Sequence, residues 1–163
     1  MREPPPVSAF ASDPLAAAVG QALSTARAEI GVRRTALFWL DGDSGRLACV
    51  ATSGAGGPAG WVGETLSAGL GMASRAVREG RPVWTPDLLA DGQVPIAPWL
   101  RARLEAEGLR VVAAAPVRIA GATRGALGFL DEPGRTYDPD ALRRIGGVAD
   151  EVARDLERAA RSA

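Results

Sequence analysis

Apolar residues recur at helical spacing near the start of the chain, between Asp13 and Ile30. One helical face is formed by Leu15, Val19, Ala22, Leu23, Ala26 and Ile30. We expect Asp13 to cap this helix, Pro14 to occupy its first turn and Gly31 to end it. Residues 1–12, which contain three consecutive prolines, are expected to form a flexible or polyproline lead-in.

Two hairpins are predicted from strand-like runs that flank glycine-containing turns. The first is "RTALFWLDGDSGRLACVATS", residues 34–53, and the second runs from Val111 to about Leu130. In the second hairpin Val111, Ala113 and Ala115 share one face of a strand, while Val112 and Ala114 share the other. A strand that is apolar on both faces is predicted to be covered on both.

The residues between the hairpins predict short and irregular elements. The run "GAGGPAGWVG", residues 54–63, is too glycine-rich for regular structure, so we expect a loop anchored by Trp61. A short helix in "LGMASRAVREG" should stop at Gly80, and a brief strand should follow it at residues 83–85. A further helix is expected to begin near Pro98 and to end at Gly108.

The final helix is predicted over residues 139–161, with Asp138 as its cap. Its apolar stripe has heptad-like spacing, which favours a homodimer seam shared with the first helix. The predicted seam residues are Leu15, Val19, Leu23, Leu142, Ile145, Ala149, Val152 and Leu156. Packing of the same stripe against the domain's own sheet is the alternative. Gly146 and Gly147 weaken this helix and allow a close neighbour or a local bend.

These elements predict an α+β fold in a single domain over residues 13–162. Strands joined by tight hairpins are antiparallel, so the centre should be an antiparallel sheet. The terminal helices are expected on one face of it, and the inserted loops and short helices on the other.

Composition narrows the classes of partner. The formal net charge is zero and all 19 basic residues are arginine, which gives no general attraction to nucleic acid or to an anionic membrane. No apolar run is long enough to span a bilayer, and the first residues lack a secretory signal. The single cysteine, Cys49, has no internal disulfide partner, so a cytoplasmic protein is the simplest interpretation.

The chain contains no histidine, which excludes several kinds of site within it. These are Ser-His-Asp and Cys-His nucleophiles, histidine-ligated zinc or haem, and a phosphoacceptor histidine. Neither a phosphate-binding GxxxxGK[ST] loop nor a GxGxxG motif after a strand is present. The carboxylates of Glu105 and Glu107 are expected to lie on the solvated face of a charged helix.

Two long segments resemble a known family. They are "GLGMASRAVREGRPVWTPDL" and "PWLRARLEAEGLRVVAAAPVRIAGATRGALGFLDEPGRTYDPDALRRIGGVADEVARDLERA". In order, they carry a Gly-x-Gly helix start, Gly-Arg-Pro-Val followed by Asp, a hydrophobic strand ending in Pro-Val, a glycine-containing turn, and an amphipathic final helix. Together these features resemble the GAF domain, a ligand-sensing module found in bacterial sensor histidine kinases.

The resemblance implies a non-catalytic signal-transduction module that holds a small molecule between the sheet and the inserted segment. Bilin attachment needs a cysteine beside a histidine and haem members use histidine, so neither cofactor is expected and the ligand stays unknown. The cyclic-nucleotide signature includes a lysine, which this chain lacks. Candidate ligand-binding residues are Trp61, Met72, Trp84, Asp87, Ile96, Trp99, Leu100 and Ala114. For Asp87 a helix cap, and for Trp99 a core plug, are the alternatives.

Other functions remain open at this stage. The domain could be a structural dimerisation module whose pocket is filled by its own side chains. It could also be an enzyme of the same fold, such as a free methionine sulfoxide reductase, although that redox cycle needs more than one cysteine. The expected partners are a small molecule, a second copy of the chain, and a kinase or another signalling protein of a two-component system. No metal site is predicted.

Overall fold

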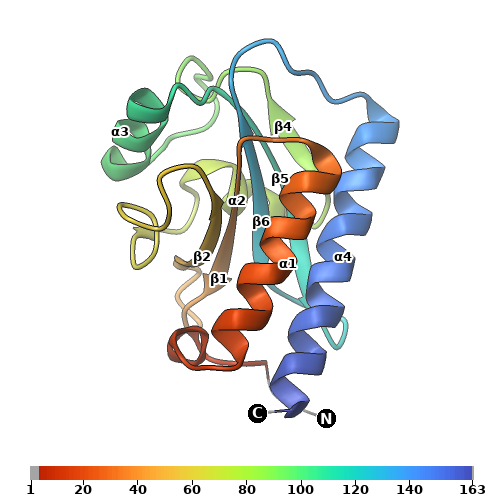
Figure 1. Cartoon of the computed structure of the whole chain (residues 1–163). Coiled ribbons are helices and arrows are strands. Elements are labelled where there is room, and N and C mark those ends of the chain that lie inside the picture. The colour runs from red at the N-terminus through yellow and green to blue at the C-terminus, as the bar shows by residue number, and fades with distance from the viewer. Residues whose placement is uncertain (1–3, 163) are drawn as a thin grey trace.

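A computed structural model describes residues 4–162 of the chain (Figure 1). Its elements, in chain order, are the 3-10 helix η1 (Val7–Ala11), α1 (Leu15–Ile30), β1 (Arg34–Leu40), β2 (Leu47–Gly54), β3 (Thr65–Leu66), α2 (Gly71–Glu79), β4 (Val83–Thr85), α3 (Pro98–Glu107), β5 (Val111–Ile119), β6 (Ala122–Asp131) and α4 (Pro139–Ser162).

The strands form one six-stranded sheet in the order β3-β2-β1-β6-β5-β4, and every adjacent pair is antiparallel. Its centre is the pairing of β1 with β6, which sets Arg34 opposite Leu130. The β5–β6 hairpin turns at Ala120 and Gly121, both of which have a positive φ. The predicted α+β class and antiparallel sheet are therefore confirmed.

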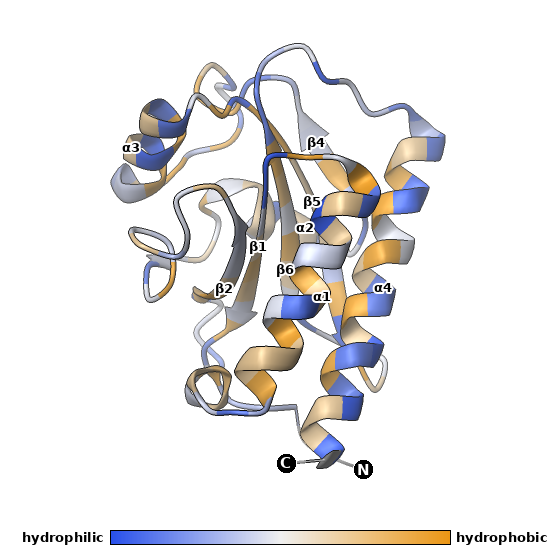
Figure 2. Ribbon diagram, viewed as in Figure 1, coloured by the Kyte–Doolittle hydropathy of each residue, from blue (hydrophilic) through white to orange (hydrophobic). Residues whose placement is uncertain are grey.

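Helices α1 and α4 pack against each other and cover one face of the sheet (Figure 1). Their apolar stripes turn toward the strands, and the charged residues of α4 face away (Figure 2). Ile145, Ala149 and Leu156 are almost fully buried there, together with Val111, Ala113 and Phe129 of the sheet.

This packing corrects the residues predicted for a dimer seam. Seven of the eight are buried inside the chain, and Leu142 alone among them is half-buried. The stripe arises because a helix lying on a sheet needs the same apolar spacing as a helix in a coiled coil. A seam through those seven side chains would require the core to open.

The small residues of the β5–β6 hairpin allow close approach on several sides. Ala113 and Ala115 face the α1–α4 layer, whereas Ala114 faces α2 across the sheet. At Gly125, a Cβ would lie 2.1 Å from the carbonyl oxygen of Phe38 on the neighbouring strand β1. The small side chains of this hairpin therefore let helices pack close to both faces of the sheet.

The ends of the helices follow the predictions except at the start of α1, where Asp13 and Pro14, predicted as the cap and the first helical residue, both precede the helix. Asp138 caps α4, because its carboxylate accepts the backbone N–H of Ala141 at 2.8 Å. Gly31 ends α1 with a φ of 76°. Asp13, however, does not cap α1: the helix begins at Leu15, and the N–H of Ala16 donates to the carbonyl of Ser12 instead.

Of the predicted lead-in, residues 1–3 lie outside the described residues, and the described part, residues 4–12, differs from the flexible segment that the prolines predict. Residues 7–11 form η1, and Phe10 is buried with its ring 5.1 Å from that of Trp39. The indole N–H of Trp39 donates to the carbonyl of Pro5 at 2.8 Å. An aromatic contact and a hydrogen bond thus hold the lead-in against the edge of the α1 layer.

Candidate functional site

The second face of the sheet is covered by the residues between β2 and β5. We call these residues, 55–110, the inserted segment. Its buried side chains meet those of the strands in one apolar cluster. Trp61, Met72 and Leu100 come from the inserted segment, and Phe38 and Ala114 come from the sheet. All five are at most 4% exposed, so these side chains fill the space between the sheet and its cover.

Trp61 anchors the glycine-rich loop at residues 54–63, as predicted. Its ring is fully buried, and its indole N–H donates to Glu107 Oε2 at 2.7 Å. Helical turns at the end of the loop support this position, since the N–H of Trp61 donates to the carbonyl of Pro58. The loop and the last residue of α3 are therefore joined through one side chain.

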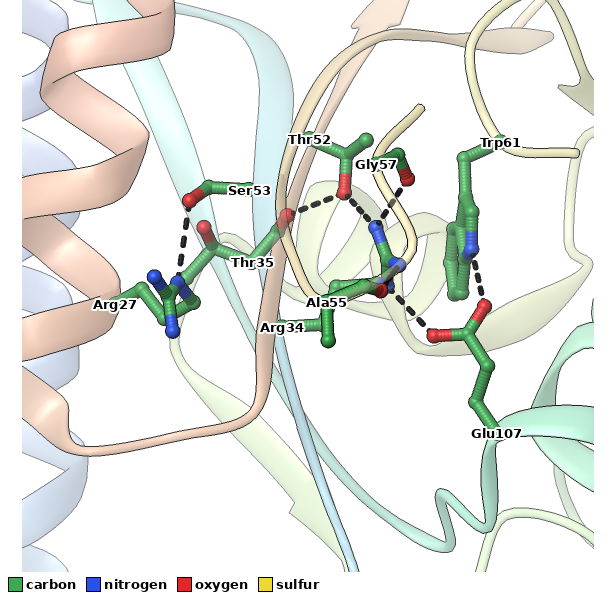
Figure 3. Close-up of polar contacts among 9 residues, drawn as sticks. All are labelled: Arg27, Arg34, Thr35, Thr52, Ser53, Ala55, Gly57, Trp61 and Glu107. Atoms are coloured by element: carbon green, nitrogen blue, oxygen red, sulfur yellow. Dashed lines mark hydrogen bonds and ion pairs between the residues drawn. The ribbon is translucent and has the colours of Figure 1, made fainter. Parts of the chain in front are cut away.

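Arg34, the first residue of β1, holds the same loop through hydrogen bonds from its guanidinium (Figure 3). Its side chain is 2% exposed, and its nitrogens donate to the carbonyls of Ala55 at 2.6 Å and Gly57 at 3.1 Å. It also donates to the hydroxyl of Thr52 at 2.8 Å, and its guanidinium lies 4.7 Å from the centre of the Trp61 ring. A buried cation thus replaces regular backbone pairing as the support of this loop.

Glu107 neutralises this buried cation. Its Oε1 lies 2.9 Å from Arg34 Nε, and its other oxygen accepts from Trp61 (Figure 3). The expectation that Glu105 and Glu107 are both solvated is correct for Glu105, which is exposed, and wrong for Glu107. Glu107 ends α3 beside the sheet, and its half-buried carboxylate gives the buried Arg34 cation a partner of opposite charge.

Trp99 lies on the outer side of the cluster. Its ring packs edge-on against Trp61, with 5.8 Å between the ring centroids, and lies 6.5 Å from Phe38. Its indole N–H donates to the carbonyl of Thr65 in β3 at 2.7 Å. The ring is half-buried and closes the outer side of the cluster, which agrees with the alternative prediction that Trp99 is a core plug.

Six of the eight predicted ligand-binding residues thus lie in or pack against one cluster, and two, Trp84 and Asp87, lie elsewhere. Trp84 is a correction: its side chain packs on the α1–α4 side, where its ring meets Tyr137 at 5.6 Å. Alternation along β4 explains this, because Val83 takes the inserted face and the next residue points the opposite way.

Asp87 and Ile96 lie in the loop between β4 and α3. Oδ1 of Asp87 accepts the N–H groups of Leu89 and Ala90, so this carboxylate caps a turn. Ile96 is half-buried and lines an open hollow of about 450 Å³ on the loop's outer side, with Leu89 and Arg101.

The single cysteine is placed for packing. Cys49 is 1% exposed within the inserted-face cluster, and its backbone pairs with Gly63 and Glu64. Burial raises the pKa of its thiol to about 12, so the thiol stays protonated at neutral pH. Because the thiolate is the reactive form, this cysteine is a poor nucleophile where it lies.

Within residues 4–162, His, Cys, Asp and Glu side chains nowhere gather in a group of three that could hold a metal ion. Over the same part of the chain, no helix combines the length and the apolar character needed to cross a bilayer.

Comparison with known proteins identifies the family. The model of the GAF domain matches residues 12–157, which is most of the chain. The chain belongs to the GAF family. Among curated proteins, no relative matches it.

Solved structures share the GAF fold with this chain at low identity. The GAF domain of a phosphoenolpyruvate-protein phosphotransferase from Coxiella burnetii is 17% identical, with a TM-score of 0.73 over 95% of this chain and 89% of that one. The GAF-B domain of DevS from Mycobacterium smegmatis is 19% identical, with a TM-score of 0.68 over 91% and 96%. A free methionine-R-sulfoxide reductase from Neisseria meningitidis, in complex with its substrate, is 16% identical, with a TM-score of 0.71 over 96% and 87%.

Sequence reasoning missed the polar part of this GAF domain's inserted face. Residue type alone does not distinguish the buried Arg34 from the exposed Arg33 beside it in "VRRTALFWL". Alternation of the strand is the signal that could have found it, since Arg34 shares a face with Ala36 and Phe38. Neither Glu107 nor Thr52 carries a comparable signal in its neighbours.

Proposed function

We propose that this GAF domain is a non-catalytic regulatory module that senses a small molecule on the inserted face. The observation that carries the proposal is the construction of the roof over that face. An irregular glycine-rich loop and the ten-residue helix α3 form it; Arg34, Glu107 and Trp61 link the two to the sheet, and Leu100 and Leu104 of α3 are buried beside it. Such a roof can open locally while the six-stranded sheet stays intact.

Trp99 is the element that we expect a ligand to displace. Its ring is half-buried, it contacts Trp61 and Phe38 by its faces and edges, and one hydrogen bond to Thr65 holds it. Moving this ring opens a path to Phe38 and to the apolar surface beneath. Aromatic and apolar walls with a few placed polar groups are typical of small-molecule sites.

The relay of the signal is proposed to run across the sheet at β5. Ala114 contacts the inserted side while Ala113 and Ala115 contact the helices, so one strand separates the two layers. A change in packing at α2 is thereby transmitted through β5 to α4. The partner is proposed to be a second copy or a signalling protein such as a kinase. With the predicted seam residues buried, a homodimer would use the outward sides of α1 and α4.

The proposal that the module is non-catalytic rests on its chemistry. A thiol reductase cycle needs an accessible thiolate, and Cys49 is the chain's single cysteine, buried with a raised pKa. The purified protein is expected to leave free methionine-R-sulfoxide unreduced in the presence of dithiothreitol. Reduction at a rate above the dithiothreitol blank, lost in Cys49→Ser, would reject this part of the proposal.

A second candidate function is a structural module with a self-filled pocket. It is favoured by the full burial of Trp61 and Met72, which occupy the space that a ligand would take. The two candidates differ in whether the roof opens. Local opening is expected for the sensor, and opening only with global unfolding is expected for the structural module.

Hydrogen exchange measured by mass spectrometry distinguishes them. For the sensor, amides of residues 55–63 and of α3 exchange by an opening that costs several kcal/mol less than global unfolding, while those of β1 and β6 do not. Native mass spectrometry of freshly purified protein then reports any bound small molecule. Equal protection of roof and sheet, with no added mass, would favour the structural module and count against sensing.

A further inference from the structure

A surface hollow of about 600 Å³ lies between the first half of α4 and the turn that joins α2 to β4. Its floor is apolar and is formed by Pro82, Pro116, Pro139 and Leu142. Leu142 is the one member of the predicted dimer stripe that the core leaves half-buried. The hollow thus contains the part of that stripe still open to another molecule.

Gly146 and Gly147 form the wall of the hollow on α4, and they differ from each other. A Cβ on Gly146 would approach Pro82 Cγ to 3.3 Å, so packing within the chain accounts for that glycine. A Cβ on Gly147 would meet nothing within 4 Å, and the residue is exposed. A glycine inside a helix costs about 1 kcal/mol relative to alanine. No contact within the described chain offsets that cost at Gly147.

The rim of the hollow is cationic. Arg81, Arg118 and Arg143 come from three different parts of the chain, and Asp150 is the one carboxylate among the residues that line the hollow. Arg118 donates to the carbonyl of Gly80 at 2.5 Å, which holds the turn before β4 against the end of β5. Three guanidiniums around an apolar floor favour a carboxylate-bearing occupant.

Two of these arginines already have partners on the surface. Arg81 pairs with Glu79 at 2.6 Å, and Arg143 pairs with Asp140. The side chains of Arg81 and Arg143 are 63% and 72% exposed. Exposed ion pairs contribute about 0–1 kcal/mol each, so carboxylates of a partner can replace them at little cost.

We propose that this hollow docks an acidic protein segment. One apolar side chain of the segment rests over Gly147 and Leu142, and flanking Asp or Glu residues pair with Arg81, Arg118 and Arg143. The bare helix surface at Gly147 permits the close approach. The site lies beside α4 and shares no lining residue with the cluster around Trp61, so it provides an output surface that does not depend on the identity of any small molecule.

The binding test uses an acetylated and amidated peptide, Glu-Glu-Leu-Glu-Glu, added to the 15N-labelled chain. Amide shifts are expected to concentrate at residues 80–82, 116–118 and 139–150 and to weaken as salt is added. The analogue Gln-Gln-Leu-Gln-Gln is expected to bind about tenfold more weakly. The absence of saturable shifts with the glutamate peptide, or shifts centred elsewhere, would overturn the proposal.

Matched variants separate docking from general charge attraction. Arg143→Glu is expected to weaken binding of the glutamate peptide about tenfold, whereas Arg154→Glu, an equal charge change on the same helix outside the hollow, leaves it within twofold. Equal losses in both variants would overturn the proposal. Gly147→Leu fills the hollow and is expected to abolish binding in a chain whose spectrum elsewhere is unchanged.

Two further measurements test other occupants. Inorganic phosphate that produces the same shifts at the same concentration would make this a small-anion site and overturn the peptide proposal. Sedimentation velocity tests the second copy: a dimer that disappears in Gly147→Leu would assign the hollow to self-association instead. The proposal expects that phosphate produces weaker shifts and that Gly147→Leu leaves the sedimentation coefficient unchanged.

Discussion

Arg34 Nε lies 2.9 Å from Glu107 Oε1, so the first residue of β1 is joined to the last residue of α3. The two are separated by 73 positions in sequence. One ion pair therefore connects the central sheet to the end of α3. The same arginine also holds the glycine-rich loop through the carbonyls of Ala55 and Gly57.

Removing the carboxylate of Glu107 is expected to be costly. Glu107→Ala leaves the Arg34 cation buried without its partner, and it should lower the free energy of unfolding by about 2–3 kcal/mol. The measurement is urea denaturation followed by circular dichroism. Glu105→Ala, on the same helix but exposed, is the matched control and should change stability by less than about 0.5 kcal/mol. Similar effects of the two substitutions would contradict the clamp.

The buried thiol of Cys49 predicts a loss of stability at alkaline pH. Its pKa is raised to about 12 by burial, whereas an unfolded cysteine ionises near 9. Between these values the unfolded state releases its proton first, so the contribution is complete below pH 9 and declines toward pH 12. Stability should therefore fall more steeply between pH 8 and pH 10.5 in the native chain than in Cys49→Ala. Parallel declines would argue against a buried thiol.

Two tryptophans on opposite faces of the sheet should have different effects on the roof. Trp99→Ala removes a contact to Trp61 and is expected to speed hydrogen exchange at residues 55–63 by about tenfold or more. Trp84→Ala removes a contact to Tyr137 on the helix side and should leave that exchange unchanged relative to the rest of the sheet. The opposite ranking would show that the loop depends on Trp84 and not on Trp99.

The hairpin glycines offer a matched pair within one strand. Gly125→Ala would force a Cβ against the Phe38 carbonyl oxygen and is expected to cost about 3 kcal/mol or to prevent folding. Gly128→Ala places its Cβ 3.6 Å from the nearest atom, an ordinary contact, and should change stability by less than about 1 kcal/mol. Thermal melting of both variants checks the order, and equal melting temperatures would refute the close approach of β1.

The α4 glycines offer a second matched pair. Gly147→Ala should raise the free energy of unfolding by about 0.5–1 kcal/mol, because helix propensity improves and the space is open. Gly146→Ala should gain less or lose stability, because Pro82 must move away. Urea denaturation of both variants measures the difference. A larger gain at Gly146 would contradict the packing of Pro82 on α4.

Local patterns in the sequence are sufficient for the four α-helices, the two hairpins and β4, and for their order, but not for η1. Asp138 and Gly31 act through short-range geometry that the sequence shows directly, and the two hairpins have turn residues that specify them. The antiparallel sheet with two covers followed from these signals and from the apolar faces of β5. The GAF assignment rested on the order of such elements, and the family comparison confirms it.

The sequence is a poorer guide to contacts between side chains that are far apart along the chain. Trp84 was assigned to the wrong face because a three-residue strand gives too little alternation to fix its register. The pairing of Arg34 with Glu107 depends on how far α3 reaches over the sheet, which no local pattern encodes. The dimer stripe was ambiguous for a different reason, because burial within one chain and burial between two chains demand the same spacing.

The pairing of β1 with β6 has a consequence for how the chain folds. Each hairpin contains its own turn and can form from neighbouring residues, but the join between them closes a loop that spans most of the sequence. Loop closure of that size is slow compared with hairpin formation. The rate-limiting event is therefore expected to be the pairing of the β1–β2 hairpin with the β5–β6 hairpin. Helix α1 is expected to pack against α4 in the same step.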